Sequence, residues 1–145
     1  MNRRFEYLLV VLMAALPLPA LADGIAAKLY KDPNCGCCEE HANYLKANGF
    51  DVTVIPTKHL TQMQEVSGVP SELAGCHTIR IGDYVFEGHI PADSIKRFLK
   101  EKPAAKGLSV PGMPAGSPGM SGTKEGPLHV YTISNTTPPK VYDTY

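Results

Sequence analysis

The 145-residue sequence predicts one α/β domain, a mixed α+β sheet with the element order β-α-β-α-β-β-α. Two observations lead to this prediction. Apolar strand patterns alternate with helical spacings of three and four between Ile25 and Pro103, and a Gly82-Asp83 pair near the middle marks a tight hairpin. The length suits a single domain, and 14 basic and 14 acidic residues leave a formal charge of zero.

The N-terminus has the features of a secretory leader. Arg3 and Arg4 precede an apolar run from Leu8 to Leu21, and Ala20-Leu21-Ala22 is a small-x-small cleavage site. The run is short for a membrane span, so an uncleaved anchor is the less favoured alternative. We expect residues 1–22 to be a cleaved signal peptide and residues 23–145 to be the mature domain. Such a protein works outside the cytoplasmic membrane, which is the periplasm in a Gram-negative bacterium.

The mature chain opens with a β-α-β pattern. Ile25 to Tyr30 predicts a short buried strand, which Asp32-Pro33-Asn34 ends. Apolar residues at helical spacing predict a helix from Gly36 to Asn48, with Gly49 as its C-terminal cap residue. Alternation from Phe50 to Pro56 predicts the second strand.

A short helix and a hairpin follow. Thr61-x-x-Gln64 matches a capping box, which predicts a helix that starts there and stops at Gly68. The segments His77–Ile81 and Tyr84–His89 flank the Gly82-Asp83 turn and predict two antiparallel strands.

A third helix completes the predicted sheet domain. Pro91 suits its first turn and Pro103 ends it. The resulting order is thioredoxin-like. Residues 107–126 are rich in Pro, Gly and Met, so we expect a loop that forms neither a helix nor a central strand, and residues 127–145 predict a terminal β-hairpin.

Three of the four cysteines lie within Cys35-Gly36-Cys37-Cys38, where the first strand leads into the first helix. A helix N-terminus favours anions, so thiolates are stabilised there. Cys35 and Cys38 form a Cys-x-x-Cys pair that can close into a redox-active disulfide. Cys37 has no use in a dithiol enzyme, but three soft thiolates on one turn suit Cu(I). Two structural disulfides remain an alternative, and so does Zn(II) bound by Cys and His.

The fourth cysteine has a histidine beside it. Cys76-His77 lies just before the third strand, where thioredoxin-like proteins carry a cis-proline that faces the redox motif. We favour His77 as a metal ligand. His89 is an open case, while His41, His59 and His129 are interpreted as ordinary histidines.

Two methionines lie in Pro-Gly-Met turns rather than in a hydrophobic pattern. Met113 and Met120 therefore have no predicted place in the core. Thioether sulfur is neutral and soft, so it favours Cu(I) over Zn(II).

Five motifs together resemble the CopG-type copper-resistance family: Pro33-x-Cys35-Gly36-Cys37-Cys38, Gly68-Val69-Pro70, Cys76-His77-Thr78, Glu87-Gly88-His89-x-Pro91 and the Pro/Gly/Met segment from Gly107 to Met120. The resemblance implies a periplasmic thioredoxin-like protein that binds several copper ions. By position, it implies the ligands Cys35, Cys37, Cys38, Cys76, His77, His89 and Met113. His41 departs from the family pattern, because an aromatic residue, commonly Trp, is expected there.

Three functions remain open at this stage. The first is a copper oxidoreductase that interconverts Cu(I) and Cu(II), with Cys35 and Cys38 as its redox pair and copper efflux or carrier proteins as partners. The second is a non-catalytic Cu(I) chaperone or buffer, and the third, less favoured, is a thiol–disulfide oxidoreductase. The sequence has no block of Lys and Arg for nucleic acid and no catalytic set typical of hydrolases.

Overall fold

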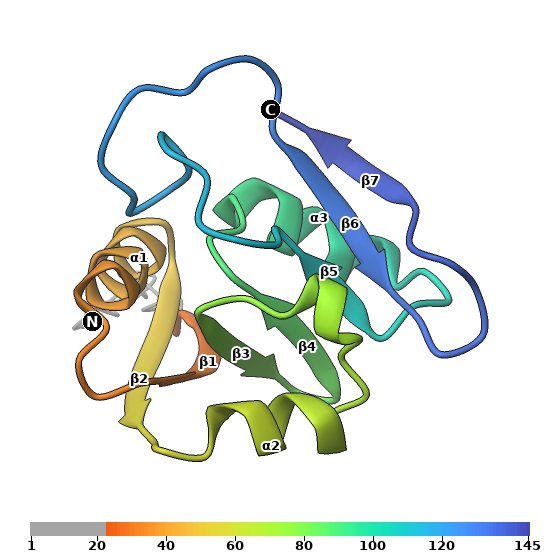
Figure 1. Ribbon diagram of the computed structural model, residues 1–145, viewed down its shortest axis with the longest axis horizontal. Helices are drawn as coiled ribbons and strands as arrows, with labels where there is room; N and C mark the ends of the chain where they lie inside the picture. Colours follow the sequence, from red (N-terminus) through yellow and green to blue (C-terminus); the bar gives the residue numbers. More distant parts are fainter. Residues whose placement is uncertain (1–22) are drawn as a thin grey trace, which may run out of the picture.

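The computed structural model describes residues 23–145 as a mixed α/β fold, so the predicted leader at 1–22 lies outside the described residues. No helix within 23–145 is long and apolar enough to cross a membrane. Figure 1 shows a single twisted sheet with helices on its faces. The elements are β1 (Ile25–Lys31), α1 (Gly36–Ala47), β2 (Phe50–Pro56), α2 (Leu60–Val66), the 3-10 turn η1 (Ser71–Leu73), β3 (His77–Ile81), β4 (Tyr84–Glu87), α3 (Ala92–Glu101), β5 (Gly107–Ser109), β6 (His129–Ile133) and β7 (Val141–Thr144).

The sheet has seven strands in the order β2-β1-β3-β4-β5-β6-β7. The pairs β1/β2 and β4/β5 are parallel, and the other neighbours are antiparallel. The predicted β-α-β unit, central hairpin and third helix are therefore confirmed in type and order.

The helices lie on both faces of the sheet. Leu45 of α1 packs with Leu29 of β1 and Ile79 of β3 in the main core. On the opposite face, Arg80 of β3 donates a hydrogen bond to Ser67 Oγ at the end of α2. The start of α3 lies beside α1, because the Ala92 amide donates to the Tyr44 hydroxyl at 3.1 Å. Cys38, in the first turn of α1, is buried in the same core as Leu29 and Ile79.

The capping box predicted at Thr61-x-x-Gln64 is wrong. Helix α2 begins two residues earlier than an N-cap at Thr61 implies, with His59 as its N-cap and no side-chain cap hydrogen bond. Gln64 is instead turned into the protein, where its amide donates to the Gly75 carbonyl and to Glu87 Oε2. The Gln64 side chain therefore bonds to residues distant in the chain instead of capping its own helix.

The prediction that residues 107–126 contain no central strand is also wrong at its beginning. β5 lies inside the sheet between β4 and β6, and Leu108 is fully buried. Gly107 permits this close pairing, since a Cβ at that position would overlap the Val85 carbonyl oxygen. Three strand residues are too few for a periodic signal, so only the neighbouring strands define β5.

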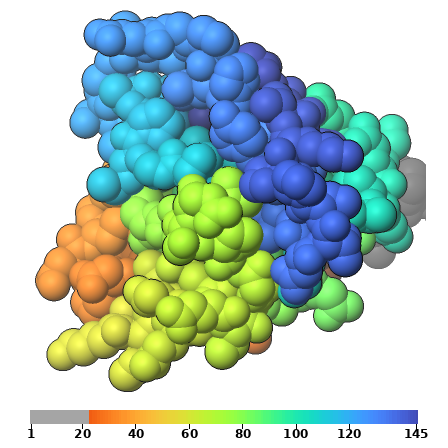
Figure 2. All heavy atoms as spheres, turned by 45° about the vertical axis from the view of Figure 1, so that its right-hand side comes forward, coloured from red at the N-terminus to blue at the C-terminus, as the bar shows by residue number. Residues whose placement is uncertain are grey.

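The terminal hairpin is confirmed as β6 and β7, and it continues the main sheet through β5. The long loop from Val110 to Pro127 leaves the sheet and returns across α1 (Figure 1). In Figure 2 this loop, in light blue, covers the top of the view and adjoins the last two strands. The loop contacts α1 closely at Gly119, where a Cβ would come within 2.5 Å of the His41 amide nitrogen.

Candidate metal centre

The cysteine turn is held by the end of β1. Asp32 Oδ1 accepts a hydrogen bond from the Asn34 amide, and the Asp32 carbonyl accepts one from Cys35. Lys31 is only 3% exposed; its ammonium donates to the Asp32 carbonyl and pairs with Glu39 at 3.3 Å. These contacts place Cys35 at the N-cap of α1, as the sequence predicted.

The sulfur atoms of the four cysteines form one cluster. Cys35, Cys37, Cys38 and Cys76 present sulfur atoms that all lie within 4.8 Å of one another. Cys35 and Cys38 are joined as a disulfide, while Cys37 and Cys76 are free. The Cys37 sulfur is 3.5 Å from that of Cys35. Reduction of the disulfide would therefore complete a set of four clustered thiols, which suits a soft metal.

Cys76 reaches this cluster from across the fold. Its carbonyl lies 3.4 Å from Cys38 Sγ, although the two residues are 38 positions apart in the chain. Burial, with the neighbouring Cys37 as a smaller cause, raises the pKa of Cys76 to about 12. Cys76 is therefore a neutral thiol in the metal-free protein, and a bound cation would displace its proton.

Two imidazoles complete a second donor group around Cys76. His77 Nδ1 lies 3.2 Å from Cys76 Sγ, and His89 Nε2 lies 3.3 Å from the same atom. Both rings are fully buried, and this burial lowers the pKa of each below its ordinary value. The two donor groups share Cys76, so several ligand atoms converge within a small volume.

His41 is part of this arrangement, although the sequence reasoning interpreted it as ordinary. Its ring is fully buried and contacts His77 Nε2 at 2.7 Å and the Ile90 carbonyl at 2.9 Å. Burial lowers the pKa of His41 to about 3, so the ring is neutral. Two signals in the sequence pointed to it: His41 follows Cys38 by three residues, which places both on one helix face, and it replaces the aromatic residue expected at that position.

A buried carboxylate holds the segment before Cys76, and sequence reasoning gave it no role. Glu87 Oε2 accepts from the Gly75 amide and from Gln64 Nε2, and its Oε1 accepts from the Thr78 hydroxyl at 2.7 Å. Burial raises the pKa of Glu87 to about 7 despite these three hydrogen bonds. The signal available in the sequence was a single acidic residue at the end of an otherwise apolar strand.

Two solved structures share this chain's fold and much of its sequence. They are titled copper resistance protein CopG, forms 1 and 2, and each is 36% identical, with TM-scores of 0.77 and 0.78. Each match covers 84% of this chain and 98% of the other. The chain belongs to the CopG family of copper resistance proteins. A family model described as a protein of unknown function, DUF411, matches residues 73–120, and no curated protein matches the chain.

In this CopG-family chain the methionines lie at the edge of the thiol cluster. Met113 Sδ is 4.0 Å from Cys37 Sγ, and the Met113 side chain is 56% exposed. Met120 lines an open hollow of about 500 Å³ together with Cys37 and Glu40. His59 and His129 are exposed and lie elsewhere, at the start of α2 and in β6. The structure therefore brings six of the seven predicted ligands together. The seventh, Met113, lies at the edge of the group and contacts only Cys37 among them.

Proposed function

We propose that this protein binds several copper ions in the periplasm through its clustered Cys and His side chains and interconverts Cu(I) and Cu(II) in copper resistance. The observation that carries the proposal is the shared position of Cys76, which belongs both to the group of four sulfurs and to the group with His77 and His89. Thiolates favour Cu(I), whereas imidazoles also suit Cu(II), so adjacent groups offer ligands to both oxidation states.

The Cys35–Cys38 disulfide can accept the two electrons that two Cu(I) ions lose on oxidation. Two Cu(I) ions that each lose one electron become Cu(II), and the two electrons break the Cys35–Cys38 bond to give two thiolates. The reverse reaction forms the disulfide and two Cu(I) ions. The free Cys37 thiol, 3.5 Å from Cys35, lies where it can bridge copper to this pair.

The location and the partners are part of the same proposal. Residues 1–22 act as a cleaved signal peptide, and residues 23–145 are the mature domain. Copper efflux or carrier proteins of the same compartment exchange the metal. A disulfide persists in such an oxidising compartment, which supports this placement.

A non-catalytic Cu(I) carrier is the second candidate. The partly exposed Cys37 and the exposed Met113 beside it favour this candidate, because soft ligands at the surface are accessible to a partner that hands over Cu(I). A thiol–disulfide oxidoreductase is disfavoured, since Cys37 adjoins the redox pair and would capture mixed disulfides.

The test is an anaerobic titration of the reduced domain with Cu(I), and with Zn(II) as the comparison. We expect more than one copper per chain and tighter binding of copper than of zinc, because the soft ligands exceed one tetrahedral shell. Metal analysis gives the stoichiometry, and oxidation followed by electron paramagnetic resonance then detects Cu(II). Saturation at one zinc, with copper bound no more tightly, would refute the proposal; a copper-loaded protein that never yields Cu(II) would favour the carrier.

A further inference from the structure

The donor group around Cys76 remains intact when the disulfide is closed. Joining Cys35 to Cys38 removes two sulfurs from the four-thiol group. Cys76 Sγ, His77 Nδ1 and His89 Nε2 are untouched by that bond and still converge. The oxidised protein therefore has a complete three-atom donor set of its own.

The hydrogen bonds of His89 determine which of its nitrogens carries the proton. His89 Nδ1 lies 2.7 Å from the Pro118 carbonyl oxygen, which can only accept. Nδ1 therefore carries the hydrogen. In a neutral ring the other nitrogen, Nε2, then has a lone pair, and this lone pair faces Cys76 Sγ at 3.3 Å.

The hydrogen bonds of His41 determine in turn which nitrogen of His77 carries the proton. His41 Nε2 lies 2.9 Å from the Ile90 carbonyl and must donate to it, so His41 Nδ1 has the lone pair of this neutral ring. His77 Nε2, at 2.7 Å from that lone pair, must in turn donate its hydrogen. His77 Nδ1 is left with a lone pair that faces Cys76 Sγ at 3.2 Å.

Two lone pairs thus face a single thiol. One S–H hydrogen can satisfy only one of them, and both rings are fully buried. A buried acceptor without a donor is costly. A cation that replaces the thiol hydrogen would satisfy both nitrogens and the resulting thiolate at once.

We propose that the disulfide form of this protein binds a single copper ion between Cys76 Sγ, His77 Nδ1 and His89 Nε2, with His41 as the positioning residue that keeps the His77 lone pair directed at the ion. This inference rests on the proposed function, because it takes copper as the cargo, and it adds a site specific to the oxidised protein.

The donor set and its spacing suit this ion. Two imidazoles and one thiolate in a trigonal arrangement are typical of protein sites that hold copper in both oxidation states. Typical metal–sulfur and metal–nitrogen bonds place S and N roughly 3.5 Å apart at a tetrahedral angle and roughly 3.8 Å apart at a trigonal one. The observed 3.2 and 3.3 Å need to widen by roughly half an ångström or less.

Two variants of His41 separate its hydrogen bond from its packing. His41→Phe keeps a ring stacked near Tyr44, as His41 is now, but offers no acceptor to His77. His41→Asn places an amide oxygen close to the position of Nδ1 and retains an acceptor. Loss of such a supporting contact typically weakens metal binding about 10- to 100-fold, so we expect this loss in the Phe variant and partial recovery in the Asn variant.

The experiment uses the domain with its Cys35–Cys38 disulfide closed and with Cys37→Ser, so that Cys76 is the only free thiol. Co(II), which does not oxidise a thiolate, is the first probe, and Cu(II) the second. We expect one ion per chain with a thiolate-to-metal charge-transfer band that Cys76→Ser abolishes. Long-range ¹H–¹⁵N spectra of the metal-free protein should show His77 protonated at Nε2 in the parent and in His41→Asn, but not in His41→Phe.

The outcomes distinguish this inference from the proposed function. If the reduced protein binds several Cu(I) ions but the disulfide form shows no Cys76-dependent band, the inference is wrong and the proposed function stands. If the band appears while the reduced protein binds no copper, the site stands and the proposed function fails. His77 protonated at Nδ1 in the parent, or equal metal affinity of the Phe and Asn variants, would overturn the role of His41.

Discussion

Cys37 lies between two cysteines that are joined to each other, and its own thiol is free. It touches the disulfide on one side, at Cys35, and a thioether on the other, at Met113. A disulfide exchange reaction needs only Cys35 and Cys38. Two sulfur neighbours would instead suit the proposed role of Cys37 as a bridging metal ligand.

Cys37→Ser should therefore reduce the number of copper ions bound by the reduced protein, while the Cys35–Cys38 disulfide still forms. A hydroxyl is a poor ligand for Cu(I), which explains the loss. Metal analysis after anaerobic loading measures the first effect, and thiol counting of the oxidised protein measures the second. Full copper stoichiometry in the variant would show that Cys37 is not a ligand.

Glu87 holds the segment that leads into Cys76. It accepts three hydrogen bonds in the interior and thereby fixes Gly75, the residue just before Cys76. Removing the carboxylate would leave the Gly75 amide, the Thr78 hydroxyl and one of the two hydrogens of the Gln64 amide without a partner.

We expect Glu87→Ala to lower the free energy of unfolding of the metal-free protein by about 3 kcal/mol or more, since each unpaired donor costs about 1–3 kcal/mol. Glu87→Gln is the matched control. Its amide oxygen can face Gly75 and Gln64 while its NH₂ group donates to the Thr78 hydroxyl, so the loss should stay below about 1 kcal/mol. Urea unfolding measures both. Equal destabilisation in the two variants would mean that the packing, or the charge itself, is what matters.

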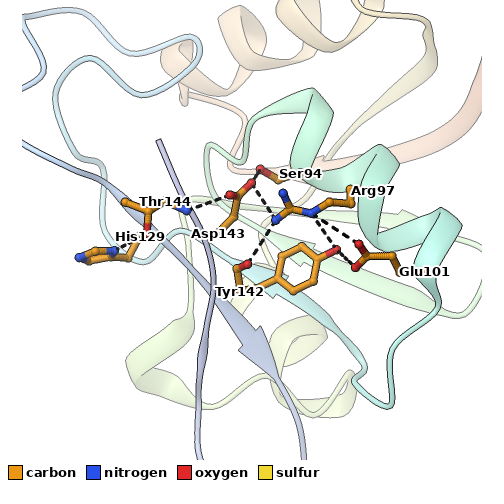
Figure 3. Close-up of polar contacts among 7 residues, drawn as sticks. All are labelled: Ser94, Arg97, Glu101, His129, Tyr142, Asp143 and Thr144. Carbon is orange, nitrogen blue, oxygen red and sulfur yellow. Dashed lines mark hydrogen bonds and ion pairs between the residues drawn. The ribbon is translucent and has the colours of Figure 1, made fainter.

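At the scale of elements, β7 is attached to α3 by a partly exposed polar network (Figure 3). Asp143 accepts from the Ser94 hydroxyl at 2.6 Å and pairs with Arg97 at 3.2 Å. The Arg97 guanidinium also lies over the Tyr142 ring, and the Tyr142 hydroxyl donates to Glu101. This network holds β7 against α3. Within the described residues, β7 pairs with β6 alone in the sheet.

The network predicts an acid-sensitive contribution to stability. Burial alone would raise the pKa of Asp143, but hydrogen bonds from Ser94 and Thr144, together with Arg97, lower it below its ordinary 3.8. A pKa that is lower in the folded state than in the unfolded state stabilises the folded protein at pH values above the ordinary pKa. This contribution is lost as the pH falls through the folded-state pKa. Asp143→Asn should therefore lower the melting temperature at neutral pH, with a difference from the parent that shrinks below pH 3.8.

Thermal unfolding at several pH values checks this prediction. Glu125→Gln removes one exposed acidic charge from the long loop, outside this network, and controls for net charge. A difference between the Asp143→Asn variant and the parent that is constant with pH would contradict the ion-pair explanation.

For the whole molecule, the proposed metal centre brings together segments that are distant in the chain. The N-terminus of α1 and the start of β3 meet at the sulfur cluster, and the returning loop supplies Met113. An ion bound there belongs only to the folded state, so it should stabilise that state by mass action.

Copper should raise the free energy of unfolding of the reduced protein by about 4 kcal/mol at a thousandfold excess over Kd. Cys76→Ser removes the sulfur that both donor groups share, with little change in volume and without disturbing the His77–His41 contact. We expect it to abolish most of the copper-dependent rise in melting temperature and to leave the metal-free value nearly unchanged. Differential scanning calorimetry, with the exposed His59→Gln as control, measures this. An undiminished rise would place the site elsewhere.

The sequence determined most of the elements, because their signals are local. Alternation in Phe50–Pro56 and the turn at Gly82-Asp83 depend on neighbours within a few residues, and the structure has a strand and a hairpin there. The spacing of Cys35, Cys37 and Cys38 placed three thiols on one turn for the same reason. Motif resemblance indicated the copper family, which the solved structures confirm.

Only the tertiary structure decided which side chains support those ligands. His41 contacts His77 36 residues away, Glu87 contacts Gln64 23 residues away, and Pro118 faces His89 29 residues away. β5 is a strand only because β4 and β6 lie on either side of it. Contacts of this range leave no periodic trace in the chain. They form because buried polar groups must find partners, and the fold alone determines which partners lie within reach.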